Sequence, residues 1–371
     1  MNSVNRRFFL TGSLSAAALG HAARAQSSPI GAGVIGTGNR GSADLKSVLA
    51  QPGVKVNALC DIKPDRLDNA ASLAAAHKPV TLKDYRELLA RRDIDAVFIA
   101  TPCDLHVEMA IAALKAGKHV YCEKPAGITP ESIQRLVDAA HAGDRVFQIG
   151  QQMRSLQRLR RAIEKVQEGA IGEVIMIKAQ RHAAADLPHD STSADWFFDA
   201  RRSGDVIVEM SVHNLDVCNW VAGSRPQRAA GFGGTLLWKN DPPGRTNMDG
   251  YSRSYEYANG VKLSYTQVFF HPRGLPGGGQ TTYVYGVKGA VDLDTATLYS
   301  LDAKSMPVVL AEPVEEDRHA HVAAFFDCIR TGAKSPADIT VAATAALTAI
   351  LGREAIYRKQ VLTWESLGVR I

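Results

Sequence analysis

Cysteine is scarce in this chain and shows no pattern. The number of cysteines is odd, and no Cys-x-x-Cys pair or Cys/His cluster has the spacing of a metal site. A disulfide framework and a structural zinc site are therefore excluded, and we predict small buried thiols and no bound metal. The five are Cys60, Cys103, Cys122, Cys218 and Cys328.

The chain also lacks a large charge of one sign. Its formal net charge is +5, and three of the arginines lie in an N-terminal leader that contains no acidic residue, so the remainder carries +2. A nearly neutral chain argues against nucleic acid or an anionic surface as the partner. Beyond the leader we find no segment long and apolar enough to cross a bilayer, so no membrane span is predicted.

The leader has the order of a secretory signal. Arg6 and Arg7 are followed by a mildly apolar run (14–19) and by Ala23-Arg24-Ala25, which has the small-x-small form of a cleavage site. We predict that residues 1–25 are a twin-arginine signal peptide and that the protein is exported to the periplasm; the alternative is a disordered tail. Because no pool of free NAD(P)H is replenished there, a nicotinamide cofactor would stay bound or pass its electrons to an outside acceptor.

What is present is an α/β pattern of ordinary composition, 46% hydrophobic and 22% charged, which is enough for two domains. Apolar strands alternate with amphipathic helices over 29–150, and this predicts a parallel sheet covered on both faces. From residue 151 the alternation changes, and one helix is expected over 151–168. Further strands are expected over 172–180, 264–270, 281–285 and 290–293, with a hairpin at Asn259-Gly260.

The most informative stretch is a glycine-rich turn between the first strand and the first helix. Glycines at 36, 38 and 41 would permit a tight turn, let backbone amides approach a pyrophosphate and bring the helix close to the strand. Asp61 ends the next strand, where a carboxylate would accept hydrogen bonds from an adenosine ribose. A glycine-rich turn beside an ordinary strand-end Asp is the alternative. The pattern predicts a dinucleotide site for NAD. Asp61 would repel the 2′-phosphate of NADP, although NADP stays open because Lys63 and Arg66 follow.

The carboxyl ends of the parallel strands place further residues beside that turn. The predicted cofactor-binding residues are Gly36, Gly38, Asn39, Arg40, Gly41, Asp61, Thr101, Pro102, His106 and Glu123. Lys124 lies just past a strand and is followed by Pro125, so its ammonium could polarise a substrate hydroxyl or carbonyl. Taken alone, it would be a loop lysine beside a turn proline.

These motifs together resemble the Gfo/Idh/MocA oxidoreductases, which include inositol dehydrogenases and the exported glucose–fructose oxidoreductase. The resemblance rests on GVIGTGNRG, Asp61, ATPxxxH (100–106), GKHVYCEKP (117–125) and the segment around His213, and it spans essentially the whole mature chain. It implies a Rossmann domain (29–150) followed by an α+β domain (151–371) with an open, mostly antiparallel sheet, whose last helices pack back on the first domain. It also implies a homo-oligomer, Lys124 as a catalytic or substrate-orienting residue, and a cis Lys124–Pro125 bond.

The segment 204–220 supplies the second half of the predicted catalytic site. If it is helical, Glu209, His213 and Asp216 share one face, and the carboxylate of Glu209 would orient the imidazole and stabilise its protonated form. A single helical histidine is otherwise more often structural. The family pattern has Asp where this chain has Glu209, so a direct substrate contact by that residue is less secure. We predict Lys124, His213 and Glu209 as catalytic, and Arg154, Asp216 and His182 as substrate-binding.

The sequence thus favours an exported NAD(P)-dependent oxidoreductase that transfers a hydride between a tightly bound cofactor and a hydroxyl carbon of a sugar, polyol or glycoside. A second hypothesis is a redox-neutral, NAD-dependent glycosidase or lyase that oxidises its substrate transiently. A third is a non-catalytic sugar sensor.

Overall fold

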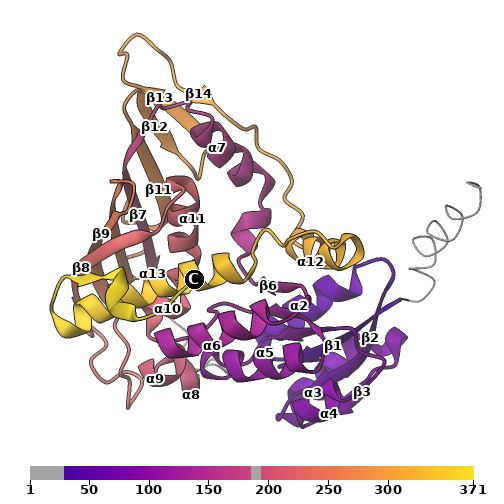
Figure 1. Cartoon of the computed structure of the whole chain (residues 1–371). Helices are drawn as coiled ribbons and strands as arrows, with labels where there is room; N and C mark the ends of the chain where they lie inside the picture. Colours follow the sequence, from indigo (N-terminus) through magenta and orange to yellow (C-terminus); the bar gives the residue numbers. More distant parts are fainter. Residues whose placement is uncertain (1–28, 185–193) are drawn as a thin grey trace, which may run out of the picture.

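The computed structural model describes residues 29–184 and 194–371. The predicted signal peptide lies outside the described residues. Residues 29–150 and the residues that follow form two domains, each built on one sheet (Figure 1).

The first domain is built on a parallel six-stranded sheet in the order β3-β2-β1-β4-β5-β6. Its strands are β1 (Ile30–Ile35), β2 (Val54–Cys60), β3 (Val80–Leu82), β4 (Ala96–Ile99), β5 (His119–Cys122) and β6 (Phe147–Ile149). Its helices are α2 (Asn39–Leu49), α3 (Pro64–Leu73), α4 (Tyr85–Leu89), α5 (His106–Lys115) and α6 (Pro130–His141), with 3₁₀ turns η1 (Ala75–His77) and η2 (Cys103–Leu105). The strands are apolar on both faces because helices cover both, as expected of a Rossmann domain.

The second domain carries a nine-stranded sheet in the order β14-β13-β12-β11-β7-β10-β9-β8-β15. Its strands are β7 (Val174–Ala184), β8 (Pro226–Gly234), β9 (Gly250–Tyr257), β10 (Lys262–His271), β11 (Gly279–Gly286), β12 (Gly289–Asp292), β13 (Thr297–Ser300), β14 (Val308–Val309) and β15 (Leu362–Thr363). Only β7 and β10 pair in parallel among these strands. The predicted fold class, a Rossmann domain followed by a mostly antiparallel open sheet, is confirmed, and Gly260 (φ +88°) lies in the expected β9–β10 hairpin.

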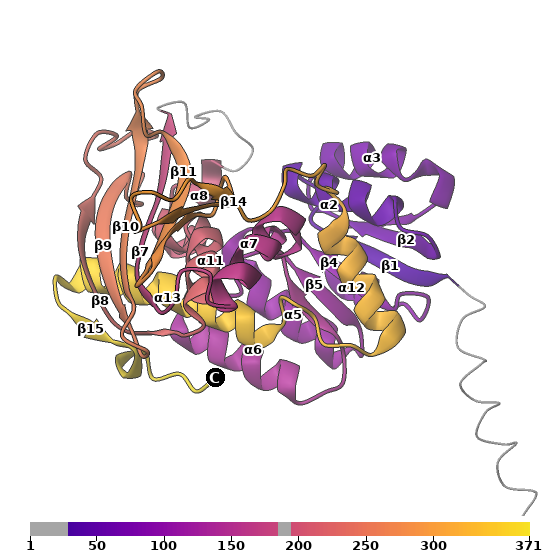
Figure 2. The same ribbon diagram turned by 90° about the horizontal axis from the view of Figure 1, so that it is seen from above.

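Helices α11 (Val212–Ala222) and α13 (Ile339–Arg358) lie between the two sheets (Figure 2). The other helices of the second half are α7 (Gln157–Gln167), α8 (Ala194–Phe197), α9 (Ala200–Ser203), α10 (Val206–Glu209) and α12 (Ala320–Thr331), with η3 (Gln152–Ser155) and η4 (Trp364–Leu367). Among the described residues, α13 is the one helix long and apolar enough to cross a membrane by length and composition, a match that the sequence reading had missed. Most of it is buried inside the protein, as in a core helix.

Helix α12 completes the core of the first domain although it comes from the far end of the chain. Phe325 packs edge-on against Phe98 of β4, with ring centroids 5.4 Å apart, and contacts Tyr121 of β5 at 5.8 Å. Phe326 joins the same buried cluster. One face of the first-domain sheet is therefore completed by a helix that follows strands β7 to β14 of the second sheet in the chain.

The helix expected over 151–168 is in fact two elements, η3 and α7, separated at Leu156, whose backbone is extended (φ −70°, ψ 116°). The cause is a distant cap. The carboxylate of Glu316 accepts hydrogen bonds from the backbone amides of Gln157 (2.8 Å) and Arg158 (2.9 Å), which would otherwise be satisfied within a continuous helix. A cap from a residue so far along the chain leaves no local signal.

Candidate active site

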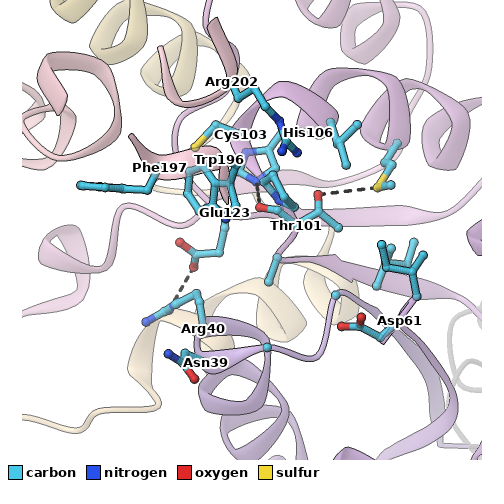
Figure 3. A pocket seen from close by; sticks show the side chains of 18 of the residues that line it. Asn39, Arg40, Asp61, Thr101, Cys103, His106, Glu123, Trp196, Phe197 and Arg202 are labelled. Atoms are coloured by element: carbon cyan, nitrogen blue, oxygen red, sulfur yellow. Dashed lines mark hydrogen bonds and ion pairs between the residues drawn. The ribbon is translucent and has the colours of Figure 1, made fainter. Parts of the chain in front are cut away.

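A cavity of about 640 Å³ lies at the carboxyl ends of the first-domain strands and reaches the second domain. Its volume falls in the range of about 300–1,000 Å³ usual for small-molecule sites. Asp61 lies at one end of the cavity and Phe197 of α8 at the other (Figure 3), and Glu209 also lines it. All the predicted cofactor-binding residues except Gly41, together with Lys124 and Glu209, line this cavity.

The glycine turn has the geometry that a dinucleotide requires. Gly36 has φ +83°, and a Cβ there would lie 2.6 Å from the carbonyl oxygen of Ala100; a Cβ at Gly41 would lie 1.8 Å from the carbonyl oxygen of Gly36. Helix α2 starts after Gly38 with no side-chain cap and no acidic residue in its first turn. Its N-terminal amides are therefore left for an anion, and the guanidinium of Arg66 lies 3.0 Å from where a Cβ of Gly38 would be. These residues fit the pyrophosphate of NAD.

Asp61 holds the turn in place as well as lining the cavity. Its Oδ2 accepts from the backbone N–H (2.7 Å) and the hydroxyl (3.2 Å) of Thr37, and its Oδ1 accepts from the N–H of Lys63 (2.9 Å). Because each carboxylate oxygen has two lone pairs, the side chain can still accept from a ribose hydroxyl. Asp61 thus couples the end of β2 to the glycine turn.

We expect the substitution of Asp61 by Ser to shift the preference from NAD toward NADP. Removing the carboxylate removes its repulsion of a 2′-phosphate, and Lys63 and Arg66 line the same end of the cavity. The ratio of kcat/KM values, NADP over NAD, should rise about tenfold or more, which corresponds to about 1.4 kcal/mol. Asp65→Ser, in the exposed first turn of α3, is the matched control; an equal shift there would show a general charge effect instead.

Arg40, whose side chain is 43% exposed, lies beside two buried carboxylates. Its guanidinium pairs with Asp44 (2.7 Å) and with Glu123 (3.0 Å), and Glu123 also accepts from Gln152 (2.8 Å). Burial raises the pKa of Asp44 to about 7 and raises that of Glu123, while Arg40 opposes both shifts.

His106 ties two loops of the cavity wall together. Its ring nitrogens each lie 2.9 Å from a backbone carbonyl, those of Thr101 and Pro125. It therefore holds the wall in shape more than it presents a polar atom to the cavity. The Lys124–Pro125 bond that follows β5 is cis.

The predicted catalytic residues come together, but not in the predicted pairing. The ammonium of Lys124 donates to the backbone carbonyl of Glu209 (2.7 Å) and forms an ion pair with the Glu209 carboxylate. His213 lies close enough to Lys124 for that charge to act on it, and its Nδ1 meets the side-chain oxygen of Gln151 at 2.8 Å. His213 itself does not line the cavity.

The single helix face expected for Glu209, His213 and Asp216 is wrong. Helix α10 ends at Glu209 and α11 begins at Val212, so the two side chains lie on different helices. The break is fixed by Ser211, whose hydroxyl is hydrogen-bonded to Tyr251 and Gln267 on the second sheet. Glu209 consequently pairs with Lys124 and not with His213.

The electrostatic prediction for His213 is also corrected. Its pKa lies well below the usual value, first because of burial and then because of the positive charges of Lys124, Arg181 and Arg40. The imidazole is therefore neutral near pH 7, where the sequence analysis had expected a carboxylate to stabilise the charged form. With the Gln151 oxygen as acceptor, Nδ1 carries the proton and Nε2 keeps its lone pair, as a general base requires.

The three predicted substrate-binding residues do not line the cavity. Arg154 and Asp216 form a buried two-point ion pair with each other (2.7 and 2.8 Å), and the Arg154 guanidinium lies over the ring of Trp220. They therefore fasten η3 to α11. His182 is bonded to Thr266 of the neighbouring strand at 2.9 Å. Among the described residues, no group of three or more His, Cys, Asp or Glu side chains could hold a metal.

Sequence reasoning missed several residues of the site. Gln151 and Gln152 follow β6 at the carboxyl edge of the sheet, a position that the sequence indicates for Gln151 without giving it a role. Trp196, Phe197 and Arg202 line the far end of the cavity (Figure 3). They follow a polar segment that gives no indication of where they pack.

We expect the acid limb of the kcat/KM profile to have its midpoint below pH 6.5, because the base must be neutral and the pKa of His213 is depressed. Arg181→Met removes one of the charges that depress it, so the midpoint should move to higher pH. Arg161→Met, on the exposed face of α7, should leave it in place. A midpoint above 6.5 in the unsubstituted protein would contradict the assignment.

Comparisons with known proteins agree with this geometry. Residues 30–151 match the model of an oxidoreductase family with an NAD-binding Rossmann fold, GFO_IDH_MocA. Residues 159–292 match the GFO/IDH/MocA C-terminal domain. Together the two matches cover more than half of the chain.

Two curated proteins and one solved structure illustrate the likeness. A glycosyl hydrolase family 109 protein of Saccharopolyspora erythraea is 36% identical over 38% of this chain and 33% of its own length. An inositol 2-dehydrogenase of Salmonella paratyphi B is 30% identical over 51% of this chain and 54% of its own length. A levoglucosan dehydrogenase solved with NADH superposes with a TM-score of 0.77 at 20% identity, over 90% of this chain and 99% of that one. The chain thus spans between a third and about half the length of these curated relatives.

Proposed function

Because this chain belongs to the Gfo/Idh/MocA family of NAD-binding oxidoreductases, we propose that it oxidises or reduces a hydroxyl-bearing carbon of a sugar, polyol or glycoside. The observation that carries the proposal is the Lys124–Glu209 ion pair beside a neutral His213, next to a glycine turn shaped for a dinucleotide. The inositol 2-dehydrogenase and levoglucosan dehydrogenase among the similar proteins support this class of substrate.

Each side chain has a defined task in this proposal. Two of the three ammonium protons of Lys124 are directed at Glu209, and the third is available to the substrate oxygen. Nε2 of His213 accepts the hydroxyl proton, and Gln151 keeps the ring in the required tautomer. NAD, when bound, supplies the acceptor for the hydride. Trp196 and Phe197 offer aromatic faces at the substrate end of the cavity.

A second reaction is favoured by one specific observation, the 36% identity to a family 109 glycosyl hydrolase. In that case bound NAD would take a hydride from the glycoside, the same residues would move the protons, the substituent would leave by elimination, water would add in its place, and NADH would return the hydride. Such a redox-neutral cycle also suits a location outside the cytoplasm.

We propose that the twin-arginine leader directs the protein to the periplasm. If this is correct, replacing Arg6 and Arg7 by Lys should retain an uncleaved precursor in the cytoplasm.

One experiment separates the two reactions. The purified protein is denatured and any released nucleotide is identified, and the intact protein is then incubated with inositols, sugars and aryl glycosides. Net oxidation, seen as reduction of NAD, would support the dehydrogenase, whereas release of the aglycone without net reduction would support the glycosidase. If no carbohydrate gives either product and no nucleotide is released, both enzymatic hypotheses are contradicted. A non-catalytic sugar sensor would then be the remaining hypothesis.

The outer face of the second sheet supports self-association. Met176, Tyr285 and Tyr299 lie in one cross-strand row over β7, β11 and β13, joined through Ala290, and all three are exposed. Figure 2 shows the helices on the opposite side. We infer that a second copy of this chain covers this face, and a solution mass of one chain would contradict the inference.

A further inference from the structure

Arg253 of β9 is a buried positive charge without a counter-charge. Its side chain is 1% exposed, and Nε, Nη1 and Nη2 have no hydrogen-bond acceptor among the described residues. The guanidinium lies beside three aromatic rings, with its carbon 4.8 Å from the centroid of Tyr251, 4.5 Å from that of Tyr265 and 5.6 Å from that of Tyr255. Aromatic faces attract a cation, but they do not accept the five N–H groups of an arginine.

The groups that face Arg253 do not supply a negative charge. They are Tyr251, Tyr255, Tyr265 and Cys218. Burial raises the pKa of Tyr255 and of Cys218 to about 12, and it raises the pKa values of the other two tyrosines as well. All four are neutral near pH 7, while Arg253 stays charged. An unpaired buried charge is strongly unfavourable, so the site calls for an anion.

The surrounding polar atoms are mostly donors. Gln267 accepts from Ser211 and Tyr251 through its oxygen, which leaves Nε2 without an acceptor. The hydroxyl of Tyr265, directly opposite Arg253 in the β9–β10 register, lies near the Ser211 hydroxyl but makes no hydrogen bond of regular geometry among the described residues. Asn214 is buried one helical turn before Cys218 on α11, and both polar atoms of its side-chain amide lack a partner among the described residues. Among these orphan atoms the side-chain oxygen of Asn214 is the only one that cannot donate.

We propose that these residues enclose a small monovalent anion of the chloride class, a site separate from the nucleotide cavity. One guanidinium balances one negative charge, and the donors of Gln267, Tyr265 and Asn214 complete the shell. The site is closed by α13, because a Cβ at Gly352 would lie 2.1 Å from the Tyr255 hydroxyl and 3.1 Å from Cδ of Arg253.

The anion would also support the active site without touching it. Ser211 sits in the break between α10 and α11, two residues from Glu209 and two from His213, and is fastened to the same Gln267 and Tyr251 that border the anion. Occupancy of the site therefore stabilises the position of both catalytic side chains through Ser211.

The test uses the whole protein at constant ionic strength, with sodium gluconate replaced stepwise by sodium chloride. We expect Tm to rise by a few degrees and to saturate, because chloride binds the folded state alone. Crystals soaked in sodium bromide should show an anomalous peak beside the Arg253 guanidinium. A flat Tm, or density at Arg253 that behaves as water in bromide, would overturn the proposal.

The matched variants are Arg253→Met and Arg245→Met. Arg245 is also buried and lies over an aromatic ring, that of Phe198, but it donates to the carbonyls of Asn247 and Met248. Both variants should be less stable, whereas only Arg253→Met should lose the dependence of Tm on chloride. Retention of that dependence in Arg253→Met would refute the site. If this variant does not fold, the anomalous signal in bromide-soaked crystals of the unsubstituted protein still shows whether an anion binds beside Arg253.

Discussion

Replacing His213 by Ala, or Lys124 by Met, should lower kcat by about 10²–10⁴-fold, the usual contribution of a positioned proton-transfer group. The affinity for NAD should stay close to that of the unsubstituted protein, because neither side chain contributes to the glycine turn. Stopped-flow turnover and nucleotide titration by fluorescence measure the two effects separately.

The controls for this prediction are His141→Ala, at the exposed end of α6, and Lys115→Met, at the exposed end of α5. Both remove the same chemical groups far from the cavity and should keep full turnover. Glu209→Gln keeps the geometry beside Lys124 and removes only the charge, so a smaller loss is expected there. If turnover is unchanged in His213→Ala and in Lys124→Met, the proposed proton transfer does not take place at these residues.

A second large effect is expected from Gly41→Ala. The added Cβ would overlap the carbonyl oxygen of Gly36 at 1.8 Å, so the turn must move. The resulting strain should lower the free energy of unfolding by about 1–3 kcal/mol. Loss of one charge-assisted hydrogen bond to the pyrophosphate, about 1.5–3 kcal/mol, should weaken NAD binding by about 10–100-fold.

Gly143→Ala serves as the comparison, since a Cβ there meets nothing within 4 Å. Its free energy of unfolding, measured by chemical denaturation, and its affinity for NAD, measured by calorimetric titration, should equal those of the unsubstituted protein. Normal NAD binding by Gly41→Ala would mean that the nucleotide does not rest on this turn.

The glycine turn and the strand ends could be predicted because their signals are local. Gly36, Gly38 and Asp61 are placed by the alternation of short strands and helices, and the carboxyl edge of a parallel sheet brings them together. The separation of the Rossmann domain from the open sheet is equally visible in the change of periodicity.

The pairing of charged side chains could not be predicted because it depends on contacts distant in sequence. The break at Ser211 is set by Tyr251 and Gln267, and Arg154 is captured by Asp216 more than sixty residues later. A helical spacing of four residues suggested that Glu209 meets His213, whereas the tertiary contact with Lys124 prevails. Periodicity finds the face of a helix but not the partner across from it.

The packing of α12 on Phe98 and Tyr121 has a consequence for synthesis. While the polypeptide is still emerging from the ribosome, the nucleotide-binding half exposes an aromatic surface that its own helices do not cover. That surface is sheltered only when residues 320–331 have been translated. The two halves of the molecule therefore reach their final form together, and a shortened chain that ends before this helix should be prone to aggregate.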